Sequence, residues 1–150
     1  MAKRSAAELG QAASRGDAAA PGVPQAAVVA IRGGRVCLIT SSSGRRWVVP
    51  KGKCPGSRGL RATARREAWE EAGLVGRLAG RPLGRYEIQK AGCRHVVVVY
   101  RMWVTEAASD WPERRKRLRD WVRPADVPAR IDHPGLRDLL RAALAGRRAA

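Results

Sequence analysis

Phenylalanine is absent from this chain and tyrosine occurs only twice, so few aromatic rings are available for stacking on a ligand. Acidic residues are also scarce: 13 Asp and Glu stand against 30 Lys and Arg, which gives a formal net charge of +17. A positive surplus of this size favours polyanionic partners such as nucleic acid, an acidic membrane surface or a highly phosphorylated small molecule. Part of the charge also follows from a composition crowded with Arg, Ala and Gly, and the charge alone does not choose among the partners.

Long apolar runs and paired cysteines are missing as well. Residues 1–24 contain no continuous hydrophobic segment, which argues against a secretory signal or a membrane span. Cys37, Cys54 and Cys93 are widely separated and have no C-x-x-C spacing, so a disulfide framework is not expected. We predict free thiols in a cytoplasmic protein that makes no membrane contact.

A chain of 150 residues is long enough for one domain with its own core. We expect a flexible N-terminal tail over residues 1–24, a single domain over 25–146 and a C-terminal tail over 147–150. The sequence does not indicate an oligomeric state.

Strand and helix signals follow one another along the domain. Strands are expected at 26–31 and 36–40, joined by an Arg-Gly-Gly-Arg turn, at 47–49, at 83–89 and 94–105 around a turn at 90–92, and at 119–122. Helices are expected at 58–72 and along the leucines of 136–144, with a short helical turn at 124–127. This order predicts an α/β fold with a mixed sheet and one helix on each face.

The helix expected at 58–72 contains three glutamates. Glu67, Glu70 and Glu71 are spaced i, i+3 and i+4, so their side chains project from one face of the helix. Carboxylate oxygens suit Mg²⁺ or Mn²⁺, whereas structural zinc prefers Cys and His ligands. The alternative is a solvated face on which Arg66 pairs with Glu70 while the other two glutamates are merely exposed.

The segment before this helix, residues 50–57, is expected to be a loop because of its Gly and Pro content. Its glycines allow close approach of the backbone, and Lys51 and Lys53 offer positive charge to a phosphate group. A metal on the glutamates and the cations of this loop would then face one anion.

This stretch resembles the Nudix box, Gly-x5-Glu-x7-Arg-Glu-U-x-Glu-Glu-x-Gly-U, in which U is an aliphatic residue. The positions that match in register are Gly52, Arg66, Glu67, Glu70, Glu71, Gly73 and Leu74, with Ala68 as a small residue at an aliphatic position. The resemblance implies a three-layer α/β/α sandwich and hydrolysis of a phosphoanhydride. It also implies that Glu67, Glu70 and Glu71 bind Mg²⁺, with Mn²⁺ as a substitute, and that Arg66, Glu70 and Glu71 are catalytic.

Arg58 stands where the box has its first glutamate, which in the family supports the loop and the metal region. Two interpretations follow. Either this support is lost and the domain is a weak or inactive Nudix-like binding module, or Arg58 is one more cation facing phosphate. We favour the second.

Outside the box the resemblance narrows to the diphosphoinositol polyphosphate phosphohydrolase branch, which also hydrolyses diadenosine polyphosphates. The matching segments are Ser41–Ser43, Trp47–Pro50, Leu83–Glu87, Val104–Glu106 and Asp110–Trp111. A substrate of this class has many negative charges, and the residues predicted to bind it are Arg45, Arg46, Lys51, Gly52, Lys53 and Arg58. The general base is left open between a glutamate of the box, Glu87 and Glu106.

Binding of nucleic acid is the alternative that we do not favour. It would use the basic run Arg114–Arg117, with Trp111 and Trp121 as stacking groups. No named nucleic-acid motif accompanies these residues, and tryptophans beside predicted strands more often pack in a core.

Overall fold

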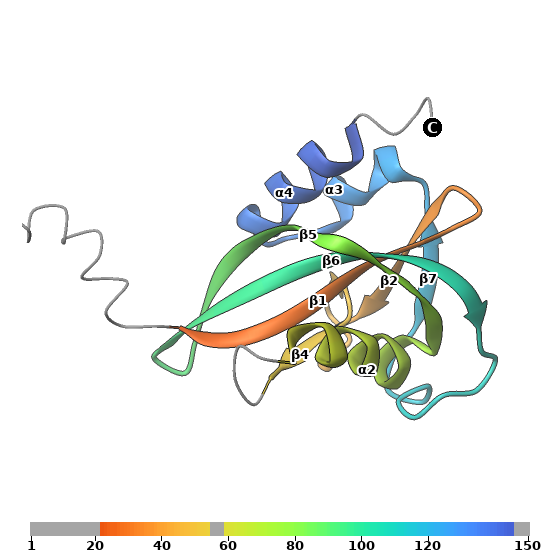
Figure 1. The fold of residues 1–150 in the computed structure, drawn as a ribbon, viewed down its shortest axis with the longest axis horizontal. Helices are drawn as coiled ribbons and strands as arrows, with labels where there is room; N and C mark the ends of the chain where they lie inside the picture. Colours follow the sequence, from red (N-terminus) through yellow and green to blue (C-terminus); the bar gives the residue numbers. More distant parts are fainter. Residues whose placement is uncertain (1–21, 55–58, 146–150) are drawn as a thin grey trace, which may run out of the picture.

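The computed structural model describes residues 22–54 and 59–145. The strands are β1 (Val23–Arg32), β2 (Arg35–Thr40), β3 (Trp47–Val48), β4 (Lys51–Lys53), β5 (Leu74–Lys90), β6 (Cys93–Ala107) and β7 (Arg119–Val122). The helices are α2 (Leu60–Ala72), α3 (Val127–Arg130) and α4 (Pro134–Ala145), with the 3-10 helix η1 (Pro124–Asp126) before α3. All seven strands join one mixed sheet, with α2 on one face and α3 and α4 on the other (Figure 1). The predicted α/β/α sandwich is confirmed.

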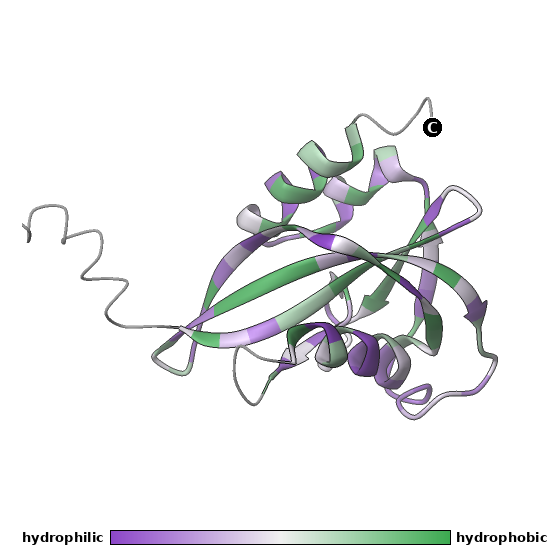
Figure 2. Ribbon diagram, viewed as in Figure 1, coloured by the Kyte–Doolittle hydropathy of each residue, from purple (hydrophilic) through white to green (hydrophobic). Residues whose placement is uncertain are grey.

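β1 is the central strand because it pairs with three others. It runs parallel to β6, antiparallel to β2 over its C-terminal end, and antiparallel to β4 over its N-terminal half. Its side chains alternate between the two faces of the sheet, and those from Ala26 to Ala30 are fully buried. The continuous apolar run at this position in the sequence is therefore a strand covered on both faces (Figure 2).

The two faces of the sheet are packed with residues of different size. On the α4 face, Leu136, Leu140 and Leu144 cover Val29, Leu38 and other aliphatic side chains. On the α2 face, small residues meet across the interface, namely Ala26 and Ala30 from β1 with Ala64, Ala68 and Ala72 from α2. Because these side chains are short, α2 packs close to the sheet and its glutamates lie near the strands.

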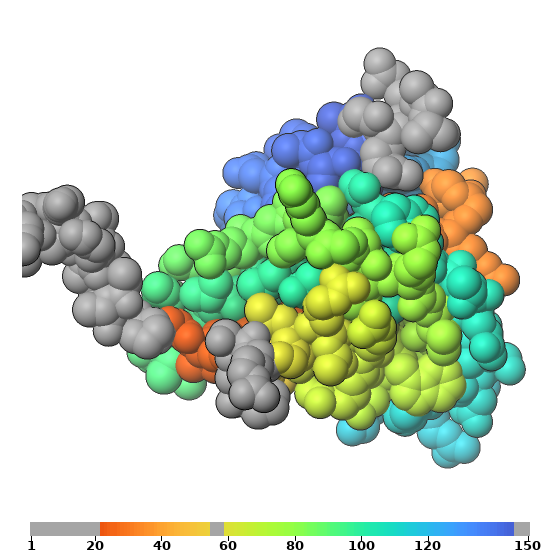
Figure 3. All heavy atoms as spheres, in the orientation of Figure 1, coloured from red at the N-terminus to blue at the C-terminus, as the bar shows by residue number. Residues whose placement is uncertain are grey.

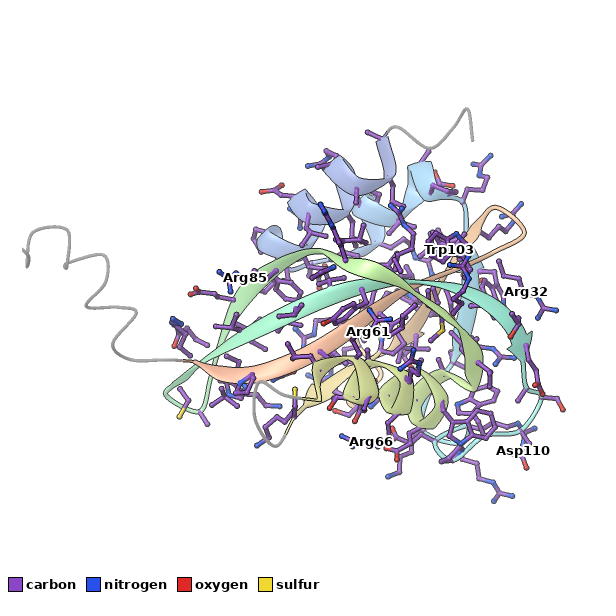
Figure 4. All side chains as sticks on the ribbon, viewed as in Figure 1. Arg32, Arg61, Arg66, Arg85, Trp103 and Asp110 are labelled. Carbon is purple, nitrogen blue, oxygen red and sulfur yellow. The ribbon has the colours of Figure 1, made fainter. Side chains whose placement is uncertain are left out.

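α2 is also attached to the edge strand β5. The two elements lie side by side on the face drawn in Figure 3. Arg61 Nη1 donates a hydrogen bond to the carbonyl of Ala79 at 2.7 Å, and its guanidinium lies over the Tyr100 ring at 5.6 Å. Figure 4 shows Arg61 on the sheet side of α2.

Four predicted boundaries of secondary structure were wrong. Lys51–Lys53 is not loop but strand β4, because the N-terminal half of β1 leaves an open edge on which residues 51–53 pair with 25–27. β1 begins at Val23 rather than at residue 26, and β5 begins at Leu74 rather than at residue 83. The helix predicted from residue 58 begins at Leu60, after Gly59 with φ +87°. Arg58 lies outside the described residues, as do residues 55–57.

The cysteines are free thiols, as predicted. Cys37 and Cys54 are buried, whereas Cys93 is exposed. Within the described residues, none of the helices has the length and apolarity that crossing a membrane would require.

Candidate active site

A cleft of about 770 Å³ lies beside β4, the C-terminal half of α2 and the start of α4. Its residues fall into two groups. The polar region, linked by hydrogen bonds and charge, contains Gln25, Arg46, Lys51, Gly52, Lys53, Glu67, Glu71, Lys90 and Arg117. The apolar region, continuous with the α4-side core, contains Trp47, Tyr86, Ile88, Ile131, His133 and Leu136.

β4 packs directly against two glutamates of α2. The backbone N–H of Lys51 donates to Glu71 Oε1 at 3.2 Å. At Gly52 an added Cβ would lie 2.5 Å from Glu67 Oε2, so any side chain there would force the glutamate or the strand to move. The first glycine of the motif is therefore needed for close approach to Glu67, and the approach is made by a strand rather than by a loop.

Glu67 and Glu71 are largely withdrawn from water, with 13% and 12% of their side chains exposed. Burial raises the pKa of Glu71 to about 7, against the lowering effects of Arg117 and the Lys51 N–H. Burial also raises the pKa of Glu67, although a hydrogen bond with Glu71 acts the other way. Burial thus opposes ionisation of two neighbouring carboxyl groups, and their all-oxygen donor set fits Mg²⁺ or Mn²⁺.

Glu70 does not line the cleft with the other two glutamates. Around the helix axis, Glu70 lies to one side of Glu67 and Glu71 lies to the other. The side chains of Glu70 and Glu71 therefore point in directions about 100° apart. In the described part of the chain, no three His, Cys, Asp or Glu side chains are grouped closely enough to hold a metal ion. The role of Glu70 as a ligand stays a prediction.

Arg66 contacts Glu67 and not, as in the solvated-face alternative, Glu70. Its Nη2 lies 3.7 Å from Glu67 Oε2, and 47% of its side chain is exposed. Figure 4 shows Arg66 on the side of α2 away from the sheet. An exposed pair of this length contributes little to stability, so its effect would be on the orientation of Glu67.

Arg117 is the site residue that sequence analysis missed. Its Nη2 donates to Glu71 Oε2 at 3.1 Å, its Nε to Glu113 Oε1 at 2.9 Å and its Nη1 to the Thr40 carbonyl at 2.9 Å. Only 11% of the side chain is exposed. In the sequence this residue ends the basic run 114–117, and nothing there distinguishes it from its exposed neighbours.

The segment between β6 and β7 closes the C-terminal end of α2. The last four carbonyls of the helix, which a helix cannot bond itself, all have donors. The Trp69 carbonyl accepts from the Gly73 N–H and that of Glu70 from the Glu113 N–H. The carbonyl of Glu71 accepts from Trp111 Nε1, and that of Ala72 from Arg119 Nη1. Figure 4 shows this segment, marked by Asp110, beside the helix end.

Two of the residues proposed for nucleic-acid binding through this segment, Arg117 and Trp111, are instead used in contacts with the end of α2, whereas Arg114, Arg115 and Lys116 are exposed. Arg117 is buried in ion pairs, and Arg114 pairs with Asp110 at 3.7 Å. The Trp111 ring lies against the backbone of Gly73 on α2 and is covered by the Arg119 guanidinium at 4.2 Å. These groups serve the end of α2.

The predicted substrate-binding cations are partly brought together. Arg46, Lys51 and Lys53 line the cleft, and Lys90, the last residue of β5, joins them. Burial lowers the pKa of Lys51, and the charges of Lys90 and Arg46 lower it further. Arg45 is exposed and does not line the cleft.

A buried polar pair lies behind these cations. Lys51 Nζ donates to Gln25 Oε1 at 3.4 Å, and Gln25 Nε2 lies 2.7 Å from His95 Nδ1. Since the ammonium can only donate, Gln25 must donate to His95, which places the imidazole proton on Nε2. Burial and the surrounding lysines, Lys53 foremost, lower the pKa of His95, so the ring is kept neutral.

The two candidate bases outside the box are not in the cleft. Glu87 is exposed on β5 and pairs with Arg94 at 3.6 Å. Glu106 lies near the end of β6, paired with Val75 at the start of β5. Neither lines the cleft, whereas Glu67 and Glu71 of the box do.

The apolar region is organised by His133. Its Nδ1 accepts the N–H groups of Gly135 and Leu136 at 3.1 and 3.3 Å, so it caps the N-terminus of α4. Its ring packs against Tyr86 with centroids 5.2 Å apart. On the same side, the Trp47 ring is covered by Arg130 at 4.6 Å.

Comparison with known proteins identifies the family of the domain that contains this cleft. A family model described as the NUDIX domain matches residues 22–143. The chain is 33% identical over 116 residues to Nudix hydrolase 16, mitochondrial, of Arabidopsis thaliana, covering 71% of this chain and 63% of that protein. It is 38% identical over 95 residues to diphosphoinositol polyphosphate phosphohydrolase 3-beta of Bos taurus, covering 61% and 57%. The chain thus spans less than two thirds of the length of these relatives.

Solved structures show the same fold. A NUDIX family hydrolase from Clostridium perfringens superposes with a TM-score of 0.67 at 16% identity, covering 81% of this chain and 95% of that one. The C. elegans Ap4A hydrolase superposes with a TM-score of 0.64 at 20% identity, covering 79% and 93%. At such identities the likeness concerns the fold alone.

Proposed function

Because the chain belongs to the NUDIX domain family, we propose that it is a Mg²⁺-dependent hydrolase that cleaves a phosphoanhydride in a highly anionic phosphorylated small molecule. The substrates we favour are a diphosphoinositol polyphosphate or a diadenosine polyphosphate. The observation that carries the proposal is one cleft in which Glu67 and Glu71 meet the cations Arg46, Lys51 and Lys53.

We assign separate roles to the residues of the polar region and to the neighbouring Glu70 and Arg66. Glu67 and Glu71 would hold the metal, with Glu70 as a further ligand and Arg66 orienting Glu67. Bound Mg²⁺ would neutralise the diphosphate and lower the pKa of an attacking water. Arg46 and the side chains of β4 would bind the phosphates and stabilise the charge that develops during cleavage.

Three predictions from the sequence remain proposals. The extra-cation interpretation of Arg58 would add it to the phosphate-binding set, and an Arg58→Glu variant would test it. The domain boundaries at residues 25 and 146 and the cytoplasmic location also stay predictions, and one relative is named as mitochondrial.

A substrate panel assayed with and without Mg²⁺ tests the function. We expect Mg²⁺-dependent turnover of a diphosphoinositol or diadenosine polyphosphate, and a loss of at least about 100-fold in Glu70→Gln with circular dichroism unchanged. Unchanged turnover in Glu70→Gln would remove this residue from the metal site. Absence of turnover on every substrate, together with steeply salt-dependent, metal-independent binding of RNA or DNA, would support the alternative of an inactive polyanion-binding domain.

A further inference from the structure

Glu71 is held by the protein at both of its carboxylate oxygens. The Lys51 N–H occupies Oε1 at 3.2 Å, and Arg117 Nη2 occupies Oε2 at 3.1 Å. The first contact is a backbone dipole, but the second is a full positive charge. Glu71, the proposed ligand of a divalent cation, is therefore already paired with the positive charge of Arg117.

The Arg117 side chain is fixed in this position by several hydrogen bonds. Each of the three guanidinium nitrogens of Arg117 bonds a different part of the fold, namely α2 through Glu71, the segment before β7 through Glu113, and the end of β2 through the Thr40 carbonyl. Two hydrogen bonds with Thr40 hold the next residue, Leu118, in place: the Leu118 N–H donates to the Thr40 hydroxyl Oγ1 at 3.0 Å, and the Thr40 N–H donates to the Leu118 carbonyl at 3.1 Å. The planar fork is thus fixed by its surroundings, as a lysine would not be.

We propose that Arg117 is a positioning residue with two opposed effects: it presets Glu71 and Glu113 in the metal-free protein, and it repels the divalent cation that binds the same carboxylate. The inference rests on the metal site proposed above. The guanidinium and a divalent cation would share the Glu71 carboxylate, and because only 11% of the arginine side chain is exposed, their repulsion is weakly screened by water. By contrast, presetting one glutamate saves only the rotamer freedom of a single side chain. The repulsion is therefore the larger effect.

Mn²⁺ alone is a suitable probe, with its binding measured by isothermal titration calorimetry and by the electron paramagnetic resonance of free Mn²⁺. We expect Arg117→Met to bind Mn²⁺ roughly tenfold tighter than the wild type. We also expect its metal-free melting temperature to fall by about 5 °C or more, because Glu71 and Glu113 lose their buried partner. Addition of Mg²⁺ should then raise the melting temperature more in the variant than in the wild type.

Three further variants separate the outcomes. Glu71→Gln should abolish the Mn²⁺ site, and Arg114→Met, which removes an exposed cation from the same segment, should leave Mn²⁺ affinity unchanged. Arg117→Lys keeps the charge and, even if Arg117→Met does not fold, should bind Mn²⁺ within about threefold of the wild type. Equal or weaker Mn²⁺ binding by Arg117→Met, or a tenfold gain in Arg117→Lys, would overturn the proposal while leaving the hydrolase function standing. A wild type that binds no Mn²⁺ would overturn both.

Discussion

The polar region of the cleft is held by hydrogen bonds between residues 20 to 70 positions apart in the chain, whereas the apolar region is an extension of the core beneath α4. In the polar region each contact has one donor and one acceptor, so removing an atom leaves a buried group without its partner. In the apolar region the stability comes from many weak van der Waals contacts, so side chains of similar volume can replace one another. We therefore expect the first region to be sensitive to small changes and the second to tolerate them.

The largest difference should come from adding one methyl group to each region. Gly52→Ala would bring a Cβ 2.5 Å from Glu67 Oε2, which forces β4 or the glutamate to move. Displacement of a catalytic group by about 1 Å is expected to lower kcat/KM by about 100-fold. Gly135→Ala is the matched control, because its Cβ would lie 3.1 Å from His133 Cε1 at the edge of the apolar region. Steady-state kinetics should show a change within about threefold there, and equal losses in both variants would refute the comparison.

A second test uses the pH dependence of stability without metal. The pKa of Glu71 is about 7 in the folded protein and near 4.5 when unfolded, so the folded state binds more protons between these values. Stability should therefore fall as pH rises from about 4.5 to about 7, by about 2 kcal/mol from this group. His95, whose pKa is lowered, acts in the opposite direction, and so the measurement is the difference between the wild type and Glu71→Gln. Chemical denaturation in EDTA across this range should give a difference that grows with pH, and a flat difference would contradict the assignment.

The smallest effect is expected in the apolar region. Trp47→Leu keeps an apolar side chain beside the cleft, and we expect KM for a diphosphoinositol substrate to rise by no more than about threefold. Lys51→Met removes only the ammonium group, because the backbone N–H that bonds Glu71 is retained, and KM should rise about tenfold. If Trp47→Leu has the larger effect with a diadenosine substrate, the apolar region binds a base and the preference between the two substrate classes is reversed.

The sequence predicted well what short-range patterns determine. The hairpin of β1 and β2, the α2 helix with Gly73 at its end, and the apolar face of α4 all follow from spacing within a few residues. The Gly-and-Glu pattern also grouped Gly52 with Glu67, and in the structure the Gly52 backbone lies against the Glu67 side chain. Such signals are local, so a single sequence contains them in full.

What the sequence could not predict depends on contacts across the fold. β4 is a strand only because β1 leaves part of one edge free, and Lys51–Lys53 has no strong strand propensity of its own. Arg117 lies 46 positions from Glu71, and in the run of four basic residues each appears equivalent. Glu70 was grouped with Glu67 and Glu71 by spacing, but the direction in which the cleft opens separates it from them.

The segment between β6 and β7 has a consequence for how this protein can change over evolution. Surface connections usually accept insertions, since little depends on their length. Here Trp111 and Glu113 of the segment, and Arg119 at the start of β7, each supply a donor to a different carbonyl at the end of α2. An insertion between them would uncap the helix that presents the glutamates, so the length of this segment is constrained as tightly as that of a secondary-structure element.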